Sequence, residues 1–327
     1  MKQQLIFGII VLLMLVLLPL TSLMFGGAAA IEQTQPPPQA QQQEQPQGLL
    51  TQSDRTVPVM RAATGEVETL DMLEYLVGVV AAEMPARFHA QALKAQAVAA
   101  HTFVRYRLEV AGAQHLSDSP DHDQGYLCPQ QRRERWGEHF ELYESRIEQA
   151  VREVYSHTLQ YNGRPIFAAY HAMSAGITEN AGTYWGRDLT FLRSVESPGC
   201  RLAANFNTTE HFTADAMRTA LGAIDGVALS GNPASWFGES TRSDAGTVLQ
   251  IDVGGTTATG RQIRQALRLR SSNFEIIFED KDGSFEVTTA GFGHGVGMSQ
   301  TGADFMARQG SNWQEILLHF YQGTEIV

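Results

Sequence analysis

The stretch EYLVGVVAAEMP, residues 74–85, defines the first helix of the folded chain and places a carboxylate directly before its end. Apolar residues recur in it with helical spacing, and Asp71 just upstream is a typical N-cap. Pro85 disfavours helical geometry at the preceding residue. We therefore expect the helix to end about Glu83, which would lie at the negative end of the helix dipole.

The next segment, residues 89–110, is rich in alanine and is predicted to be a second helix. On this helix Lys94 and His101 are seven positions apart and share one face, so both are expected to reach one cleft. Residues 111–140 are polar and predicted to be irregular, and a further amphipathic helix is expected from about His139.

Turn signals later in the chain predict hairpins. Asn162-Gly163 separates two short apolar runs, with Pro165 expected on an edge strand, and Asp282-Gly283 separates the strands 274–278 and 285–289. A strand is expected at 247–253, a capping box at Thr259 before a helix, and final helices at 300–308 and 313–321. Residues 186–245 suggest a smaller lobe. Because no β-α-β alternation appears, the fold class is α+β, with helices and antiparallel hairpins around a cleft.

A second informative stretch is GHGVGMSQ, residues 293–300, which holds three glycines and begins two positions after Gly291. Glycine lets the main chain approach a ligand closely, although a tight strand-to-helix connection uses it as well. The glycine spacing fits neither nucleotide-binding motif. His294, Ser299 and Gln300 offer donors and acceptors for sugar hydroxyl and N-acetyl groups.

The amino terminus is predicted to enter a membrane, because residues 5–25 carry no charge and are long enough to cross a hydrocarbon core. We expect residues 1–30 to be an uncleaved anchor with the remainder extracytoplasmic, and a cleaved signal peptide is the alternative. Residues 31–54 are dominated by Gln and Pro, which is typical of a linker. The folded domain is then 55–327.

Composition limits the class of partner. The chain has 327 residues, 43% of them hydrophobic, which is enough for a sizeable core, and its formal net charge is −11. Nucleic acid is excluded as an expected partner, because phosphate binding needs a basic face.

Four segments occur together in one order: residues 74–85, 93–102 (LKAQAVAAHT), 170–180 (YHAMSAGITEN) and 293–300. In this order they resemble the stage II sporulation protein D family over most of residues 55–327. The resemblance implies a lytic transglycosylase that cleaves the β-1,4 bond between N-acetylmuramic acid and N-acetylglucosamine in peptidoglycan. It also implies action in sporulation engulfment, on glycan strands whose peptides have been removed.

Glu83 matches the family's catalytic glutamate in its Ala-Glu-Met-Pro motif. Apolar neighbours and the helix end are expected to raise the pKa of Glu83, which a general acid near neutral pH requires. A lytic transglycosylase needs one such group, since the muramoyl C6 hydroxyl attacks its own C1 and leaves a 1,6-anhydro end. Should Glu179 face Glu83, a two-carboxylate hydrolase becomes the alternative.

Further substrate contacts are expected in the same segments, at Lys94, His101, Tyr170, Ser174, Gly176, Thr178, His294, Ser299 and Gln300. Lys94 could bind a carboxylate such as the lactyl group of muramic acid. His101 departs from the family's pattern, where an arginine usually stands, so anion binding at this position is in doubt.

No cofactor is required by this chemistry. Some family members bind zinc near this region, and His115, His122 and Cys128 are the corresponding candidates, although a second nearby cysteine is missing. The two cysteines could instead form a Cys128–Cys200 disulfide, or both could be free thiols.

Two further functions remain open. The family is similar to amidase enhancers, so a non-catalytic partner of a cell-wall amidase is the main alternative, and Glu83 would then be dispensable. The second is a metal-dependent hydrolase built on His115, His122 and Cys128.

Overall fold

The computed structural model describes residues 55–327, which belong to one compact unit. The predicted anchor, 1–30, and linker, 31–54, lie outside the described residues. Within 55–327, no helix combines the length and the apolar character that a membrane crossing needs.

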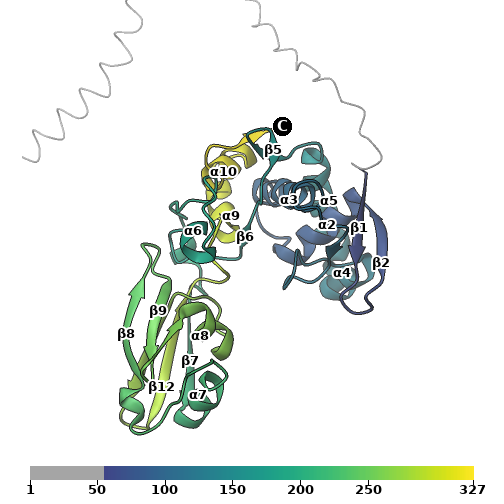
Figure 1. Ribbon diagram of the computed structural model, residues 1–327. Helices are drawn as coiled ribbons and strands as arrows, with labels where there is room; N and C mark the ends of the chain where they lie inside the picture. The colour runs from purple at the N-terminus through teal and green to yellow at the C-terminus, as the bar shows by residue number, and fades with distance from the viewer. Residues whose placement is uncertain (1–54) are drawn as a thin grey trace, which may run out of the picture. The chain divides into compact units, whose positions relative to one another are not determined.

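The first hydrophobic core is built mainly by helices. α2 (Met72–Glu83), α3 (Ala90–Arg105) and α5 (Phe140–Val154) pack on one another beside the hairpin of β1 (Thr56–Met60) and β2 (Val67–Asp71) (Figure 1). The side chain of Asp71 accepts a 3.1 Å hydrogen bond from the N–H of Glu74, and Met84 is extended. Both predicted ends of the first helix are therefore confirmed.

α3 lies at the centre of this core. It contacts α2 and α5 and also α9 (Gln300–Arg308) and α10 (Trp313–Phe320), and it continues as a π-helix over Tyr106–Val110. Its residues from Ala92 to Val104 are buried apart from Lys94, which is half-buried. The helix is thus enclosed on several sides, whereas an amphipathic surface helix has one open face.

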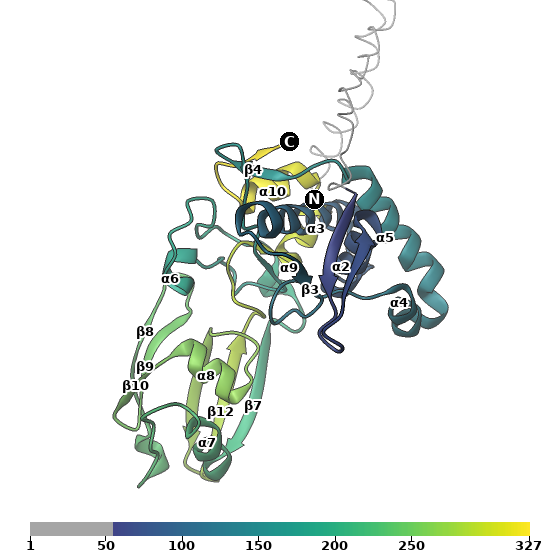
Figure 2. The same ribbon diagram turned by 45° about the vertical axis from the view of Figure 1, so that its right-hand side comes forward.

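A second core occupies residues 207–290. One antiparallel sheet has the order β11 (Phe274–Glu279), β12 (Ser284–Ala290), β7 (Asn207–Thr213), and another β10 (Thr256–Thr259), β9 (Val248–Val253), β8 (Phe237–Arg242). α7 (Ala214–Leu221) contacts the first sheet and α8 (Gly260–Leu267) the second (Figure 2). The capping box at Thr259 is confirmed. The predicted smaller lobe exists, but it begins later and ends later than 186–245, because its sheets recruit β11 and β12.

The turn predictions hold. Asn162 and Gly163 have φ of 52° and 71° and connect β4 (Leu159–Tyr161) to β5 (Arg164–Pro165), which is an edge strand. The chain's last strand, β14 (Glu325–Ile326), pairs on the other side of β4. Short 3-10 turns lie at Gly137–His139, Cys200–Leu202 and Pro233–Ser235.

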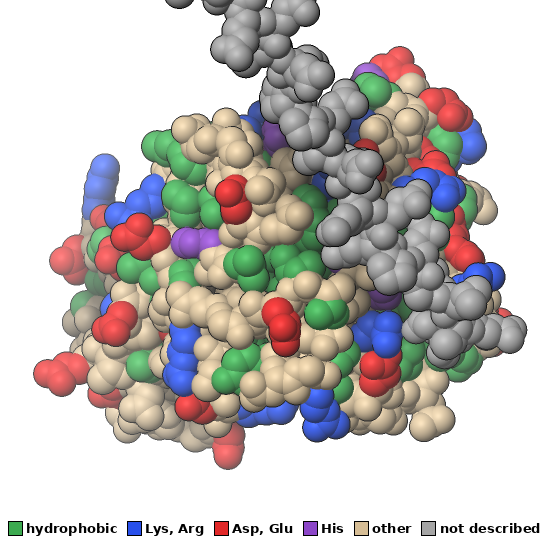
Figure 3. Space-filling model, turned by 90° about the horizontal axis from the view of Figure 1, so that it is seen from above, with side chains coloured by type: hydrophobic (Ala, Val, Ile, Leu, Met, Phe, Trp, Pro, Cys, Tyr) green, Lys and Arg blue, Asp and Glu red, His purple; other side chains and the backbone are tan. Residues whose placement is uncertain are grey.

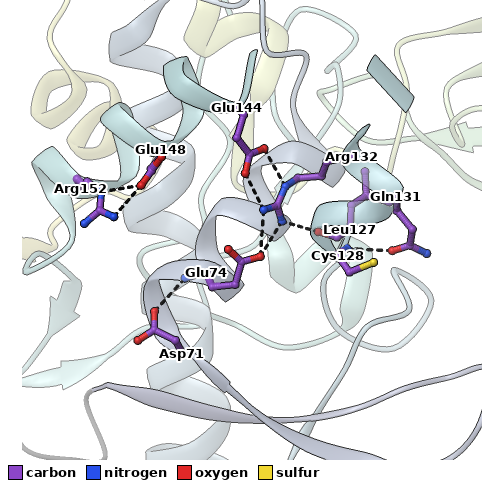
Figure 4. Close-up of polar contacts among 9 residues, drawn as sticks. All are labelled: Asp71, Glu74, Leu127, Cys128, Gln131, Arg132, Glu144, Glu148 and Arg152. Atoms are coloured by element: carbon purple, nitrogen blue, oxygen red, sulfur yellow. Dashed lines mark hydrogen bonds and ion pairs between the residues drawn. The ribbon is translucent and has the colours of Figure 1, made fainter. Parts of the chain in front are cut away.

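The region predicted to be irregular, 111–140, contains β3 (Leu116–Ser117) and α4 (Pro129–Trp136), so that expectation was wrong in part. Arg132 of α4 is buried and binds Glu74 of α2 and Glu144 of α5 (Figure 4). An ionic contact holds α4 in place. A helix held by ionic contacts does not need an apolar stripe, so the sequence of α4 lacks the pattern from which a helix would be predicted.

A short parallel pairing joins the middle of the chain to its end. β6 (Tyr170–His171) pairs with β13 (Met298–Ser299), and the small helix α6 (Ala181–Trp185) follows β6. The α+β class is confirmed, with two parallel pairings, β1–β3 and β6–β13, added to the expected antiparallel hairpins.

Candidate active site

Glu83 is half-buried at the carboxyl end of α2. Its Oε1 accepts a 2.7 Å hydrogen bond from the backbone N–H of Gly125. Within the described residues two influences act on the pKa of Glu83: burial raises it, and the Gly125 N–H opposes that shift. The pKa is raised overall, which suits a carboxyl group that must carry a proton near neutral pH.

Two cavities, of about 530 and 850 Å³, meet at Glu83. Both are lined by Glu83, Ala172, Phe292 and Gln300, so they are two arms of one cleft. The smaller arm continues past Arg135, Arg270 and Arg308, and the larger arm past Tyr170, Trp185 and His294. A polymer could therefore extend on both sides of the carboxyl group.

The wall opposite Glu83 comes from β6 and from the start of α9. The Tyr170 hydroxyl donates to Oε1 of Gln124 at 2.9 Å, and Nε2 of Gln300 donates to Oε1 of Gln96 at 3.2 Å. Burial raises the pKa of Tyr170 well above its ordinary value, so its hydroxyl stays neutral. Tyr170 and Gln300, both predicted from sequence, thus lie in the cleft with oriented polar groups.

The glycines of residues 291–297 allow the backbone to lie close to another segment of the chain, and Gly293 also lines the larger arm. A Cβ on Gly297 would lie 2.0 Å from the carbonyl oxygen of Ala169, and one on Gly293 would lie 2.8 Å from Cβ of His171. Both have positive φ. The bare backbone lies against the chain's own 169–173 segment, so the tight-connection alternative describes this loop better.

His294 lies in the larger arm, where its ring centre is 5.0 Å from that of Trp185 and 5.6 Å from that of His171. Burial, reinforced by Arg264, lowers the pKa of His294 to about 4. Its Nδ1 accepts from the Val296 N–H at 3.1 Å. The imidazole is therefore neutral at pH 7, with its orientation fixed by backbone.

Four predicted contact residues lie beneath the cleft instead of in it. Ser299 caps α9 and accepts from the N–H of Ser174, and Thr178 is bonded to Val195 backbone. Gly176 has φ of 107° and lies against Arg201. None of the four lines either arm at Glu83, and their contacts support the loops that do.

Lys94 and His101 lie elsewhere, which corrects the expectation that both reach the cleft. Lys94 forms an ion pair with Glu153 of α5, and the buried ring of His101 stacks on Tyr155 at 5.9 Å. The helical spacing placed them on one face correctly. That face is covered by α5, whose position no local pattern reveals.

Glu179 does not face Glu83. It is buried with one oxygen accepting from the Asn180 N–H at 2.9 Å and the other from the Ser243 hydroxyl at 2.5 Å. It lines neither arm of the cleft. A two-carboxylate site made of Glu83 and Glu179 is therefore inconsistent with this geometry.

The candidate zinc ligands are not brought together. Within residues 55–327, no three His, Cys, Asp or Glu side chains are arranged to hold a metal ion, so His115, His122 and Cys128 do not fit zinc. Cys128 is the N-cap residue before α4, with its N–H bound to Gln131 (Figure 4). Cys200 is buried among serine hydroxyls, and both thiols are free, which excludes the Cys128–Cys200 disulfide in this structure.

Some cleft residues were missed by the sequence reasoning. Gly125 contributes only a backbone N–H, and no side chain signals it. Phe292 has 45% of its surface exposed although it is apolar, and it lies where the two arms meet. An aromatic residue inside the glycine-rich stretch was the available signal for Phe292.

Charged side chains of both signs lie on the molecular surface. In Figure 3 acidic and basic side chains alternate over the visible part of one face, without an extended basic area. Arginines gather instead along the cleft, where Arg135 and Arg270 line the smaller arm.

Comparison with known proteins adds an independent result. Residues 60–161 match a family described as Stage II sporulation protein (SpoIID). The chain is 39% identical to Stage II sporulation protein D of Bacillus subtilis (strain 168) over 284 residues, which are 85% of this chain and 80% of that protein. It is 38% identical to the protein of the same name from Bacillus amyloliquefaciens over equal shares. It is 24% identical to a Bacillus subtilis protein called Amidase enhancer, over 77% of this chain and 40% of that protein.

Proposed function

Because the chain belongs to the stage II sporulation protein D family, we propose that it is a lytic transglycosylase of the sporulating cell wall, with Glu83 as acid and base. The observation that carries the proposal is the position of Glu83. It is a half-buried carboxyl group with a raised pKa at the junction of two arms of one cleft.

The remaining carboxylates that line the cleft have different partners. Asp304 in the smaller arm binds Arg308 and the N–H of His89. Asp123 in the larger arm pairs with Arg107, while Asp121 is exposed on a loop. Burial raises the pKa of Glu83, as a group that acts first as an acid requires, and the proposal assigns the reaction to this one carboxyl group.

In the proposed reaction Glu83 donates its proton to the oxygen that links N-acetylmuramic acid to N-acetylglucosamine. The C–O bond at muramoyl C1 breaks, and the sugar's own C6 hydroxyl attacks C1. The carboxylate of Glu83 then takes the hydroxyl proton, so acid and base roles alternate on one group and no water is consumed. The intramolecular attack gains rate from proximity. The Gly125 N–H holds the carboxyl group in one orientation throughout.

The substrate and its location complete the proposal. The strand would be peptide-free glycan, held outside the cytoplasmic membrane, with residues 1–30 as anchor and 31–54 as tether. Other engulfment proteins, including a cell-wall amidase that removes the peptides, are the expected partners.

Mass spectrometry of peptide-free glycan strands incubated with the full chain tests the reaction, beside a Glu83→Gln variant. New 1,6-anhydromuramoyl ends with the parental chain and none with Glu83→Gln are expected. Reducing ends in place of anhydro ends would mean hydrolysis and would contradict the proposal.

A second function is favoured by the similarity to the Amidase enhancer. In that case the chain would raise the activity of a cell-wall amidase without cutting glycan. The Glu83→Gln variant separates the two functions, because an enhancer retains its effect on the amidase and an enzyme loses its cleavage.

A further inference from the structure

A pocket of about 440 Å³ adjoins the larger arm of the cleft. We call it the arginine pocket, and its main lining residues are Arg261, Arg264, Arg268, Tyr184 and Trp185. Trp185 and His294 line both this pocket and the larger arm, so the surface from Glu83 to the arginines is continuous.

The three arginines lie on α8 and at its carboxyl cap. Arg264 donates to the Tyr184 hydroxyl at 3.4 Å and to the carbonyl of Leu269 at 3.3 Å, and Arg261 lies 5.3 Å from the centre of the Tyr184 ring. Throughout residues 55–327, no carboxylate forms an ion pair with any of the three. Their charge is therefore uncompensated in a chain whose net charge is −11, and an anion is the ligand that would balance it.

Aromatic rings form the side of the pocket nearest the cleft. The rings of Tyr184 and Trp185 are 6.0 Å apart at 77°, and both are half-buried. Flat apolar faces beside charged donors are the combination that binds a molecule with both an apolar face and an anionic group. A sugar acid has both features.

We propose that the arginine pocket binds the carboxylate of a sugar acid in the glycan strand, at a residue removed from the bond that Glu83 cleaves. This inference rests on the proposed function. The carboxylate is the lactyl group of N-acetylmuramic acid. In a peptide-bearing strand that group is an uncharged amide, and after the peptide is removed it is an anion. The pocket would thus distinguish stripped strands from peptide-bearing strands by charge.

Binding is measured by calorimetry with full-length chains carrying Glu83→Gln, so that cleavage does not interfere. The ligands are peptide-free strands and the same strands after their lactyl carboxylates have been converted to methylamides. The test variant is Arg261→Gln with Arg264→Gln. The control is Lys281→Gln with Arg164→Gln, which removes the same charge at two exposed positions outside the pocket.

Removal of charged hydrogen bonds is expected to weaken binding of peptide-free strands by about tenfold to a hundredfold in the test variant. The control should bind like the parental chain. Conversion of the lactyl carboxylates to methylamides should weaken strand binding by the parental chain to a similar extent. In the test variant the same conversion should cause little further loss of binding. Equal losses by test and control variants, or an unchanged affinity for amidated strands, would overturn the assignment.

A phosphate polymer could present a similar charge, so poly(glycerol phosphate) is included as a competitor. If poly(glycerol phosphate) displaces the bound strands more strongly than added peptide-free glycan does, the carboxylate assignment is overturned in favour of phosphate. Thermal melting of both double variants checks their folding. The proposed reaction is judged separately. If the parental chain forms anhydro ends but the arginine substitutions do not change binding, only the pocket assignment is rejected. If binding depends on the arginines but no anhydro ends form, only the reaction is rejected.

Discussion

The backbone N–H of Gly125 meets Oε1 of Glu83 at 2.7 Å, although the two residues are 42 positions apart in the chain. The carboxyl group is thereby fixed by a backbone donor, which no substitution at residue 125 other than proline removes. Tyr126 next to Gly125 stacks on Tyr75 of α2 at 5.5 Å, which ties the Gly125 loop to the same helix that carries Glu83.

We expect Gly125→Ala to reduce glycan cleavage at least tenfold while the chain stays folded. A Cβ at this position would lie 3.1 Å from Oε1 of Glu83 and 3.4 Å from Cβ of Ala82, so the carboxyl group must shift by some tenths of an ångström. Misplacement of a catalytic group by such small amounts is costly. Release of anhydro ends and the melting temperature are the measurements. Unchanged cleavage by Gly125→Ala would contradict the expectation.

Glu83→Gln should raise the melting temperature at neutral pH. The folded-state pKa of Glu83 is raised above its ordinary value of 4.5, so its stabilising contribution is complete below that value and is lost as pH rises through the folded pKa. The melting temperature of the variant should therefore be close to that of the parental chain at about pH 4 and higher than it at about pH 7. Glu239→Gln, at an exposed position, should show no such trend. A difference between Glu83→Gln and the parental chain that does not change with pH would be the contrary result.

Arg132→Ala should lower the free energy of unfolding by about 3 kcal/mol, near the lower end for removal of one partner from a buried ion pair. Its guanidinium contacts Glu74, Glu144 and the carbonyl of Leu127, so α2, α4 and α5 all lose a contact (Figure 4). The lower end applies because both glutamates retain access to water. Denaturant titration measures the change. Arg152→Ala, which breaks the exposed pair with Glu148, should cost about 0.5 kcal/mol, and equal effects of the two would refute the assignment.

Thiol titration of the native protein should detect one reactive cysteine. Cys128 is partly exposed, whereas Cys200 is buried, with its sulfur within 3.6 Å of the hydroxyls of Ser174, Ser197 and Ser299. A second thiol should react only after unfolding, and Cys128→Ser should abolish the native signal. Detection of no thiol in the unfolded chain without reductant would instead indicate a disulfide.

The sequence predicted local structure well wherever the signal itself is local. The Asp71 cap, the stop at Pro85 and the Asn162-Gly163 turn each depend on residues within a few positions, and the structure confirms all three. The helix α4 was missed because Arg132 holds it through partners 58 and 12 positions away.

The site was predicted less completely than the fold, for a related reason. Glu83, Tyr170, His294 and Gln300 lie in the cleft, as expected. Lys94 does not, because a helical pattern tells which residues share a face and leaves the neighbour of that face unknown. For the glycine loop the sequence left a ligand surface and a tight connection open. The structure shows close contact with another segment of the chain, and Gly293 and His294 also line the larger arm of the cleft, which only the three-dimensional arrangement reveals.

The pairing of β6 with β13 has a consequence for the timing of activity. Glu83 is made early, but the cleft is also lined by Phe292 and Gln300, which are synthesised much later than Glu83. A nascent chain that has not yet reached residue 291 therefore contains Glu83 without the residues that line the rest of the cleft. Synthesis of residues 291–300 is in this sense the step that completes the cleft.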